Sequence, residues 1–344
     1  MLEFEKEHFE DLNYFRNIAL EETVETDREY HRHMIGGWHD SSVGLNVRKD
    51  ALLDELKAAA KAKDYGRMQQ IFFTYNKREL SWHFPENCDH CFIAHSVIPY
   101  LCCADYGEIY NACPEDLPLA ANGNPMLVNA TSLLQCILYK GKYDEQTVKA
   151  NAEKYIASKD GKWYRAYVAC FLAILKEDAV MLSDNLQIIC ENHSRRGYLT
   201  AFEKFHCQYA YGLVIIARHN LSEDIFDKVR LPEHKTFDKG YMEWLYAGEF
   251  VRQSVYNYEA PFEEFDLVYE MPLPKTMIHQ KYLNEDRLII SSKGKNAYYI
   301  DDEAMDAQVL DYVMFTLMRK NEEIMMLQIG EDGNIVKLGK KEKG

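Results

Sequence analysis

The chain has 344 residues and a formal net charge of −15, from 40 lysines and arginines against 55 aspartates and glutamates. This charge repels the phosphate backbone of nucleic acids, so it excludes a nonspecific nucleic-acid-binding protein and favours a basic partner. With 47% hydrophobic and 28% charged residues, the composition is that of a globular protein, long enough for two domains or one elongated repeat array.

Neither export nor membrane insertion is predicted. The N-terminus alternates charged and single apolar residues, whereas a signal peptide needs a basic start and an apolar core. The longest stretch without Asp, Glu, Lys or Arg, residues 117–139, is interrupted by Pro118, Gly123 and Pro125 and cannot span a bilayer as a continuous apolar helix. The nine cysteines are odd in number and scattered, which is typical of unpaired thiols in a reducing cytosol. We therefore expect a cytoplasmic protein.

An N-terminal helical segment is expected over residues 1–50. It contains His31, His33 and His39, close to Trp38 and the pair at 36–37, Gly-Gly. Alternating histidines can bind a metal or a proton, but no carboxylate or thiol lies nearby at metal-ligand spacing. The favoured interpretation is a polar helix end followed by a glycine turn.

Residues 51–258 are predicted to form an array of helical hairpins. Apolar residues recur at helical spacing over 127–138, 163–175 and 205–216, and a polar turn with a second, more charged helix follows each stretch. In the second stretch, the stripe of Trp163, Tyr167, Phe171 and Ile174 is expected to be buried. Similar turns recur at markers 41, 38, 35 and 42 residues apart: Asp64, Asp105, Tyr143, Asp178 and Asn220. Such a recurrence is typical of stacked helical repeats, and an irregular helical bundle is the alternative.

The sharpest chemical constellation is His83, Cys88, Cys91 and His95, with His90 between the thiols. Two thiolates spaced Cys-x2-Cys and two nearby imidazoles suit a tetrahedral zinc ion. The surrounding apolar run, however, resembles a buried helix in which Cys91 and His95 occupy core positions. The core interpretation is favoured, so no metal is expected. A redox role is disfavoured because no strand precedes the first cysteine.

Other catalytic signatures are weak. His206 and Cys207 suggest a Cys-His nucleophile pair, but neighbouring residues on a helix point about 100° apart and cannot pair with each other. The chain contains no Gly-x4-Gly-Lys-Ser/Thr, no Gly-x-Gly-x2-Gly, no Gly-x-Ser-x-Gly and no His-Glu-x2-His. The sequence therefore predicts no catalytic residues, no cofactor and no enzymatic activity.

Residues 259–344 are predicted to form a small α+β appendage. Prolines 261, 272 and 274 place the boundary near residue 259. Short strands are expected at 287–290, 297–300, 324–329 and 335–338, with a hairpin turn at 330–334. Residues 304–319 suit a helix, although Val309, Tyr312, Val313 and Phe315 leave that assignment open.

Tyrosines and carboxylates dominate the remaining pattern. The chain has 24 tyrosines and acidic clusters such as 263–266 and 301–303. Such clusters are usually only a solvated face. When interleaved with tyrosines they also form recognition surfaces for basic proteins, because aromatic side chains supply contact area and carboxylates steer the encounter.

The segments 163–167 (Trp-Tyr-Arg-Ala-Tyr), 205–221 and 231–232 (Leu-Pro) are similar to those of the bacterial immunity protein 49 family, over roughly residues 52–248. The resemblance implies a helical, cytoplasmic antidote that binds a cognate toxin without catalysis. It assigns no functional residue by position and does not cover the N-terminal fifty residues or the appendage.

Three functions follow from the sequence. The first is an immunity protein that occludes a basic toxin such as a nuclease. The second is a helical-repeat adaptor or regulator of an unrelated protein. The third, which is disfavoured, is a zinc-dependent enzyme centred on His83, Cys88, Cys91 and His95. The partner-binding face and the oligomeric state are not predicted.

Overall fold

The computed structural model describes residue 10 and residues 12–14, 16–18, 20, 26–44, 46–81, 90–248, 250–281 and 297–326. Within these ranges the chain is mainly α-helical, with one small two-stranded sheet near the C-terminal end. The predicted fold class, mainly α with a small C-terminal α+β appendage, is confirmed. No helix in the described ranges is both long enough and apolar enough to cross a membrane.

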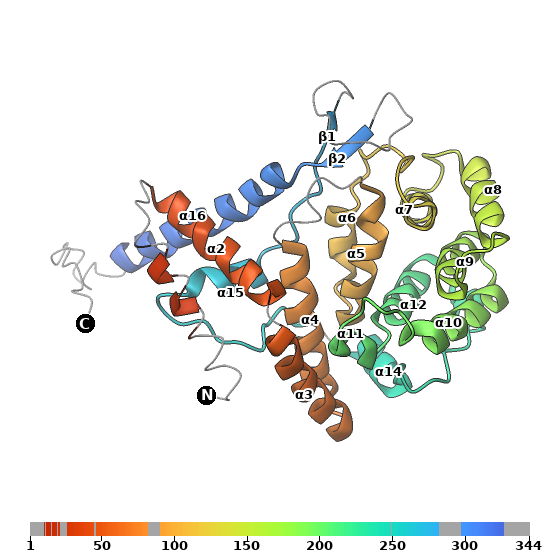
Figure 1. Ribbon diagram of the computed structural model, residues 1–344, viewed down its shortest axis with the longest axis horizontal. Coiled ribbons are helices and arrows are strands. Elements are labelled where there is room, and N and C mark those ends of the chain that lie inside the picture. Colours follow the sequence, from red (N-terminus) through yellow and green to blue (C-terminus); the bar gives the residue numbers. More distant parts are fainter. Residues whose placement is uncertain are drawn as a thin grey trace.

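In the described ranges, sixteen helical elements precede the C-terminal appendage. In chain order, the first are α2 (Asp27–Gly44), α3 (Asn46–Ala62), α4 (Tyr65–Ser81), η1 (His90–Phe92), α5 (Ile93–Tyr100), η2 (Leu101–Cys103), η3 (Tyr106–Glu108) and α6 (Ile109–Ala112). The next are α7 (Pro125–Leu138), α8 (Glu145–Ile156), α9 (Lys162–Lys176), α10 (Ala179–His193), α11 (Ala201–Phe205), α12 (Gln208–Asn220), α13 (Glu223–Phe226) and α14 (Lys239–Ala247). In Figure 1, α4 and α5 stand between the group α7–α10 and the group α2, α15 and α16.

Two regular hairpins, α7–α8 and α9–α10, stack in the middle of the array. Helix α9 packs against α7 on one side and α10 on the other. Its stripe of Trp163, Tyr167, Phe171 and Ile174 is buried, as the apolar spacing predicts. Burying this stripe from both sides accounts for the stacking, because one hairpin alone cannot cover it.

Three of the hairpin turns share a backbone device. Lys63, Ala104 and Glu177 adopt the left-handed conformation, with φ of 55°, 68° and 57°. The next residue is in each case one of the turn markers, and Asp64 and Asp178 accept hydrogen bonds from the first turn of the following helix, at 3.0 and 2.9 Å. At Asp64 and Asp178, therefore, a left-handed residue ends one helix and an aspartate caps the next, whereas Tyr143 and Asn220 follow no left-handed non-glycine residue.

The flanking hairpins are less regular. The helix predicted over 205–216 is wrong at its start, because His206 is extended and separates α11 from α12. The backbone N–H of Cys207 donates to the carbonyl of Thr236 at 2.8 Å. This contact between residues distant in sequence stabilises the interruption between α11 and α12. After Asn220 the second helix is only the short α13, and after Asp105 only η3 and α6.

Helices α5 and α12 make a very close approach at Gly212. A Cβ atom at this position would lie 1.9 Å from the carbonyl oxygen of Ile98. Glycine is therefore required here by space, and the contact sets the separation between two helices that carry the site described below.

The appendage contains α15 (Glu263–Glu270), β1 (Ile278–Lys281), β2 (Ala297–Ile300) and α16 (Asp302–Met326). The strand predicted at 297–300 is confirmed as β2, which pairs antiparallel with β1 so that Ile278 faces Ile300. Residues 304–319, for which the sequence left a helix open, lie within α16. The strand predicted at 324–329 is wrong at its start, since α16 continues through Met326. The predicted segments at 287–290, 330–334 and 335–338 lie outside the described residues.

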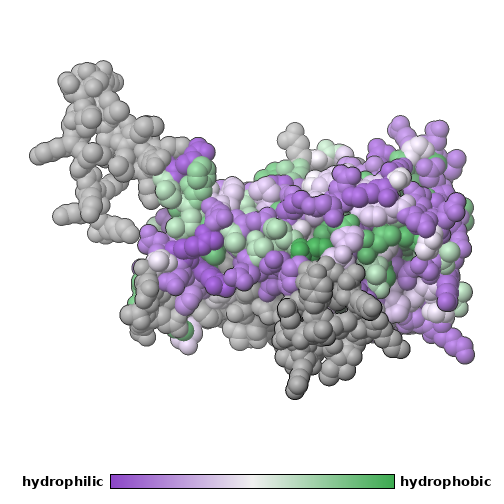
Figure 2. Space-filling view, turned by 90° about the horizontal axis from the view of Figure 1, so that it is seen from above, coloured by the Kyte–Doolittle hydropathy of each residue, from purple (hydrophilic) through white to green (hydrophobic). Residues whose placement is uncertain are grey.

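Residues from both ends of the described chain pack together. Trp38 of α2 is buried and stacks on Phe265 of α15 with ring centroids 5.3 Å apart, and Arg28 pairs with Asp311 of α16 at 2.5 Å. Figure 1 shows α2 and α16 side by side. The face that carries β1 and β2 is mainly hydrophilic, with hydrophobic side chains gathered in a strip across its middle (Figure 2).

Candidate functional site

The predicted zinc residues are only partly described. His83 and Cys88 lie outside the described residues. The carbonyl of Cys91 accepts a hydrogen bond from Thr131 Oγ1 at 2.5 Å, whereas the His95 imidazole faces the hydroxyl of Tyr209. Cys91 and His95 thus have different neighbours, and the described ranges contain no group of three or more His, Cys, Asp or Glu side chains placed to hold a metal. None of the eight described cysteines forms a disulfide.

The N-terminal histidines do not form a common site. The pair at 36–37 lies inside α2, so the predicted glycine turn after a polar helix end is wrong. His31 Nδ1 lies 3.8 Å from Glu264 Oε1, His33 is exposed, and His39 is buried at the edge of the cavity described next. The helix continues through both glycines because Trp38 is anchored in the core.

A cavity of about 410 Å³ lies where α4, α5, α10, α11 and α12 meet, with His39 of α2 at its edge. We call it the histidine pocket, and its principal lining residues are Tyr75, Glu79, His95, His193, Glu203 and Tyr209. Sequence reasoning missed Glu79, His193, Glu203 and Tyr209 because they come from four helices and share no local motif.

Hydrogen bonds fix the imidazoles and the phenol of the pocket. His95 Nε2 lies 3.0 Å from the Tyr209 hydroxyl, and His193 Nε2 lies 2.7 Å from the carbonyl of Glu203. Burial, together with the charge of Arg196, lowers the pKa of His95 to about 3. His95 is therefore neutral at neutral pH and adds no positive charge to the pocket.

A Cys-His pair lies beneath this pocket. Burial alone would raise the pKa of Cys207, but a hydrogen bond from the Cys190 thiol and the adjacent His193 outweigh it and lower the pKa. His206 turns instead toward the Tyr211 hydroxyl, with Nδ1 at 3.3 Å, which agrees with the expectation that 206 and 207 do not pair. Cys207 is fully buried, so its thiol cannot reach a molecule in the pocket without movement of the surrounding helices.

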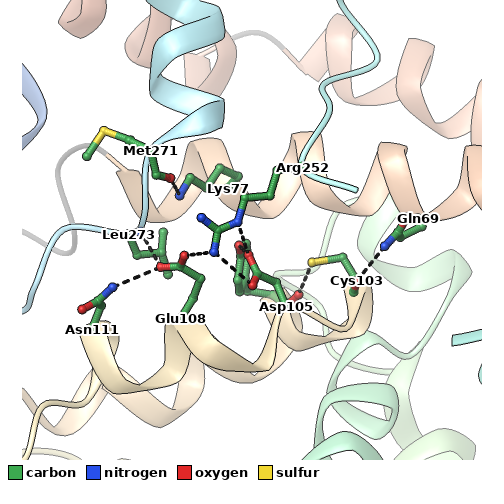
Figure 3. Close-up of polar contacts among 10 residues, drawn as sticks. Gln69, Lys77, Cys103, Asp105, Glu108, Asn111, Arg252, Met271 and Leu273 are labelled. Atoms are coloured by element: carbon green, nitrogen blue, oxygen red, sulfur yellow. Dashed lines mark hydrogen bonds and ion pairs between the residues drawn. The ribbon is translucent and has the colours of Figure 1, made fainter. Parts of the chain in front are cut away.

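A second group of charges, the ion cluster, consists of Lys77, Asp105, Glu108 and Arg252 (Figure 3). Arg252 donates to Asp105 through Nε at 3.1 Å and also donates to Glu108. Glu108 accepts the backbone N–H of Leu273 at 2.5 Å, and Lys77 Nζ donates to the carbonyl of Met271 at 2.6 Å. Burial lowers the pKa of Lys77 to about 8, against the opposing effect of Glu108. The cluster ties the segment 250–273 to α4 and η3.

Surface aromatics form a third feature, the aromatic stripe of Tyr106, Tyr110, Tyr139, Tyr143 and His219. The ring of Tyr106 stacks on His219 at 3.8 Å and meets Tyr110 at 6.0 Å, and Tyr110 meets Tyr139 at 6.3 Å. Lys142 Nζ lies over the rings of both Tyr139 and Tyr143. Burial and Arg218 lower the pKa of His219, so its ring is neutral at neutral pH. The stripe connects the turns of three hairpins, because Tyr106, Tyr143 and His219 lie at or next to the turn markers at 105, 143 and 220.

The aromatic stripe is both accessible and rigid. Tyr110 is 47% exposed, and the exposed carboxylates of Glu115 and Asp116 lie in the same turn region. The hydroxyls of Tyr139 and Tyr143 donate to the carbonyls of Cys113 and Leu117 at 2.6 and 2.9 Å. Such fixed rings lose little conformational entropy when a partner covers them.

Comparison with known proteins gave no match: no family model matches this chain, and no significant similarity to a curated protein or a solved structure was found.

Proposed function

We propose that this chain is an immunity protein that binds a cognate bacterial toxin and neutralises it by occlusion, without catalysis. The observation that carries the proposal is the aromatic stripe, a row of rigid, partly exposed rings at the turns of stacked hairpins. Tyrosines of this kind are the usual energetic anchors of protein interfaces.

Charge supports a basic toxin as the partner. The net charge of −15 attracts a basic protein over long range, while the stripe supplies contact area at close range. The two contributions act on different steps, because long-range charge accelerates association and close packing slows dissociation.

A helical-repeat adaptor or regulator is the second candidate. The same stripe favours it, since stacked hairpins present extended binding surfaces to many kinds of protein. The two candidates differ in their partner, which is the product of an adjacent toxin gene in the first case only.

The experiment is to co-purify the chain with the product of the adjacent gene and to measure growth protection in cells that express that product. Tyr110→Ala should weaken the complex about 30-fold, corresponding to roughly 2 kcal/mol for an interface anchor. Tyr14→Ala is the control, since Tyr14 is 61% exposed and lies outside the stripe. The association rate should fall as salt rises, and dissociation should change less.

Absence of both a complex and growth protection would refute the immunity role. A complex that Tyr110→Ala and Tyr14→Ala weaken equally would refute the assignment of the stripe as its interface.

A further inference from the structure

The histidine pocket contains a carboxylate with one unsatisfied oxygen, in a Glu79 side chain that is 34% exposed as a whole. Glu79 Oε1 is buried and accepts no hydrogen bond from any described residue. Arg78 Nη2 lies 3.9 Å from this oxygen, which makes an ion pair without a hydrogen bond. An unsatisfied buried carboxylate oxygen is costly, and a donor supplied by a ligand removes that cost.

A second carboxylate lines the same pocket. Glu203 Oε2 accepts the backbone N–H of Thr200 at 2.7 Å as part of a capping box, which fixes the side chain at the start of α11. Glu79 and Glu203 thus come from different helices and approach one space from two sides of the lining.

The remaining walls suit a cation. Tyr75 supplies an aromatic ring, and ring faces attract ammonium and guanidinium groups. The ring of Tyr209 is already covered, because the Arg196 guanidinium lies 4.8 Å from its centroid. His95 stacks on Tyr209 with ring centroids 5.1 Å apart and remains neutral at neutral pH. Among the described residues that line the pocket, none is a lysine or an arginine.

From these contacts we infer that the histidine pocket binds an organic cation, a guanidinium or primary ammonium group, between the carboxylates of Glu79 and Glu203 and against the ring of Tyr75. The cation is either a free small molecule or an arginine or lysine side chain of a protein partner, because both present the same chemistry. The inference does not depend on the immunity role.

The test uses ethylguanidinium as the probe and ethylurea as its neutral counterpart of nearly equal shape. Binding to the full chain is measured by calorimetry and by NMR chemical shifts of the His95 ring. Glu79→Gln and Glu203→Gln each remove one negative charge with little change in size. Glutamine also serves in a capping box, so Glu203→Gln keeps the start of α11. Glu153→Gln, on the exposed surface of α8, is the matched control.

The expected result is saturable binding of ethylguanidinium, at least tenfold weaker in Glu79→Gln and in Glu203→Gln and unchanged in Glu153→Gln. Ethylurea should not bind. Micromolar affinity for the probe would assign the pocket to a free cation. Millimolar affinity would assign it to an arginine or lysine side chain of a protein partner, of which the probe is only a fragment. Equal binding of ethylurea, equal weakening by Glu153→Gln, or no saturable binding of ethylguanidinium would overturn the inference.

Discussion

The ion cluster and the histidine pocket both collect charged side chains around α4, yet their hydrogen bonding differs. In the ion cluster, both oxygens of Asp105 and both of Glu108 accept hydrogen bonds from the chain itself. In the histidine pocket, Glu79 Oε1 accepts none from the described residues. A satisfied network indicates a structural role, whereas an unsatisfied acceptor beside a cavity indicates a place for a ligand.

Removing a carboxylate from the satisfied network should have the largest effect. Glu108→Ala leaves the Leu273 N–H without its acceptor and deprives Arg252 of one of its two carboxylates. The free energy of unfolding should fall by about 3 kcal/mol, the lower end for a broken buried pair because Asp105 remains. Urea denaturation measures it, with the exposed Glu115→Ala as the control. A loss below about 1 kcal/mol, within the range of a surface substitution, would contradict the structural role.

The close approach of α5 and α12, which form one wall of the histidine pocket, can be tested by a change in packing. Gly212→Ala places a methyl group against the Ile98 carbonyl and forces α5 and α12 apart. This overpacking should cost about 2 to 3 kcal/mol and should also weaken ligands of the histidine pocket, because His95 and Tyr209 lie on these two helices. Gly107→Ala is the control, since a Cβ there would meet nothing within 4 Å. Equal unfolding free energies for the two variants would show that the close approach is not required.

The apolar pattern predicts the packing of single helices well, as the buried stripe from Trp163 to Ile174 demonstrates. The apolar pattern fails where contacts between residues distant in sequence determine where a helix begins or ends. The break at His206 depends on a hydrogen bond to Thr236, thirty residues along the chain. The apolar run from residue 324 suits either a strand or a helix, and extending α16 is easier than nucleating a new element. Of the histidine pocket, the sequence singled out only His39 and His95, in two separate clusters, because the lining residues come from six helices.

The pH dependence of stability provides a third test, through Lys77. Its pKa is about 8 in the folded protein and about 10.4 in an unfolded chain. Between these values the unfolded chain binds more protons, so Lys77 destabilises the fold fully below pH 8 and progressively less as the pH rises. Relative to Lys77→Met, the wild type should gain about 2 kcal/mol between pH 8 and 10. Ionisation of tyrosines affects both proteins and cancels in the difference. Parallel stability curves for the two proteins would show that Lys77 is not desolvated as the structure indicates.

The smallest expected effect distinguishes the two regions most sharply. Glu79→Gln removes a partly exposed charge that is paired with Arg78 at 3.9 Å but has no hydrogen bond through Oε1 to lose, so the free energy of unfolding should fall by at most about 1 kcal/mol, against about 3 kcal/mol for Glu108→Ala. A role in holding the fold would instead make the two glutamate variants comparably unstable. Denaturation of Glu79→Gln at neutral pH, measured with and without ethylguanidinium, separates the cases. The probe should stabilise the wild type by binding its folded state, and the variant should lose that stabilisation while keeping most of its own stability. A large loss of unfolding free energy in Glu79→Gln without the probe would show that this carboxylate stabilises the fold, as those of the ion cluster do, and is not part of a binding site.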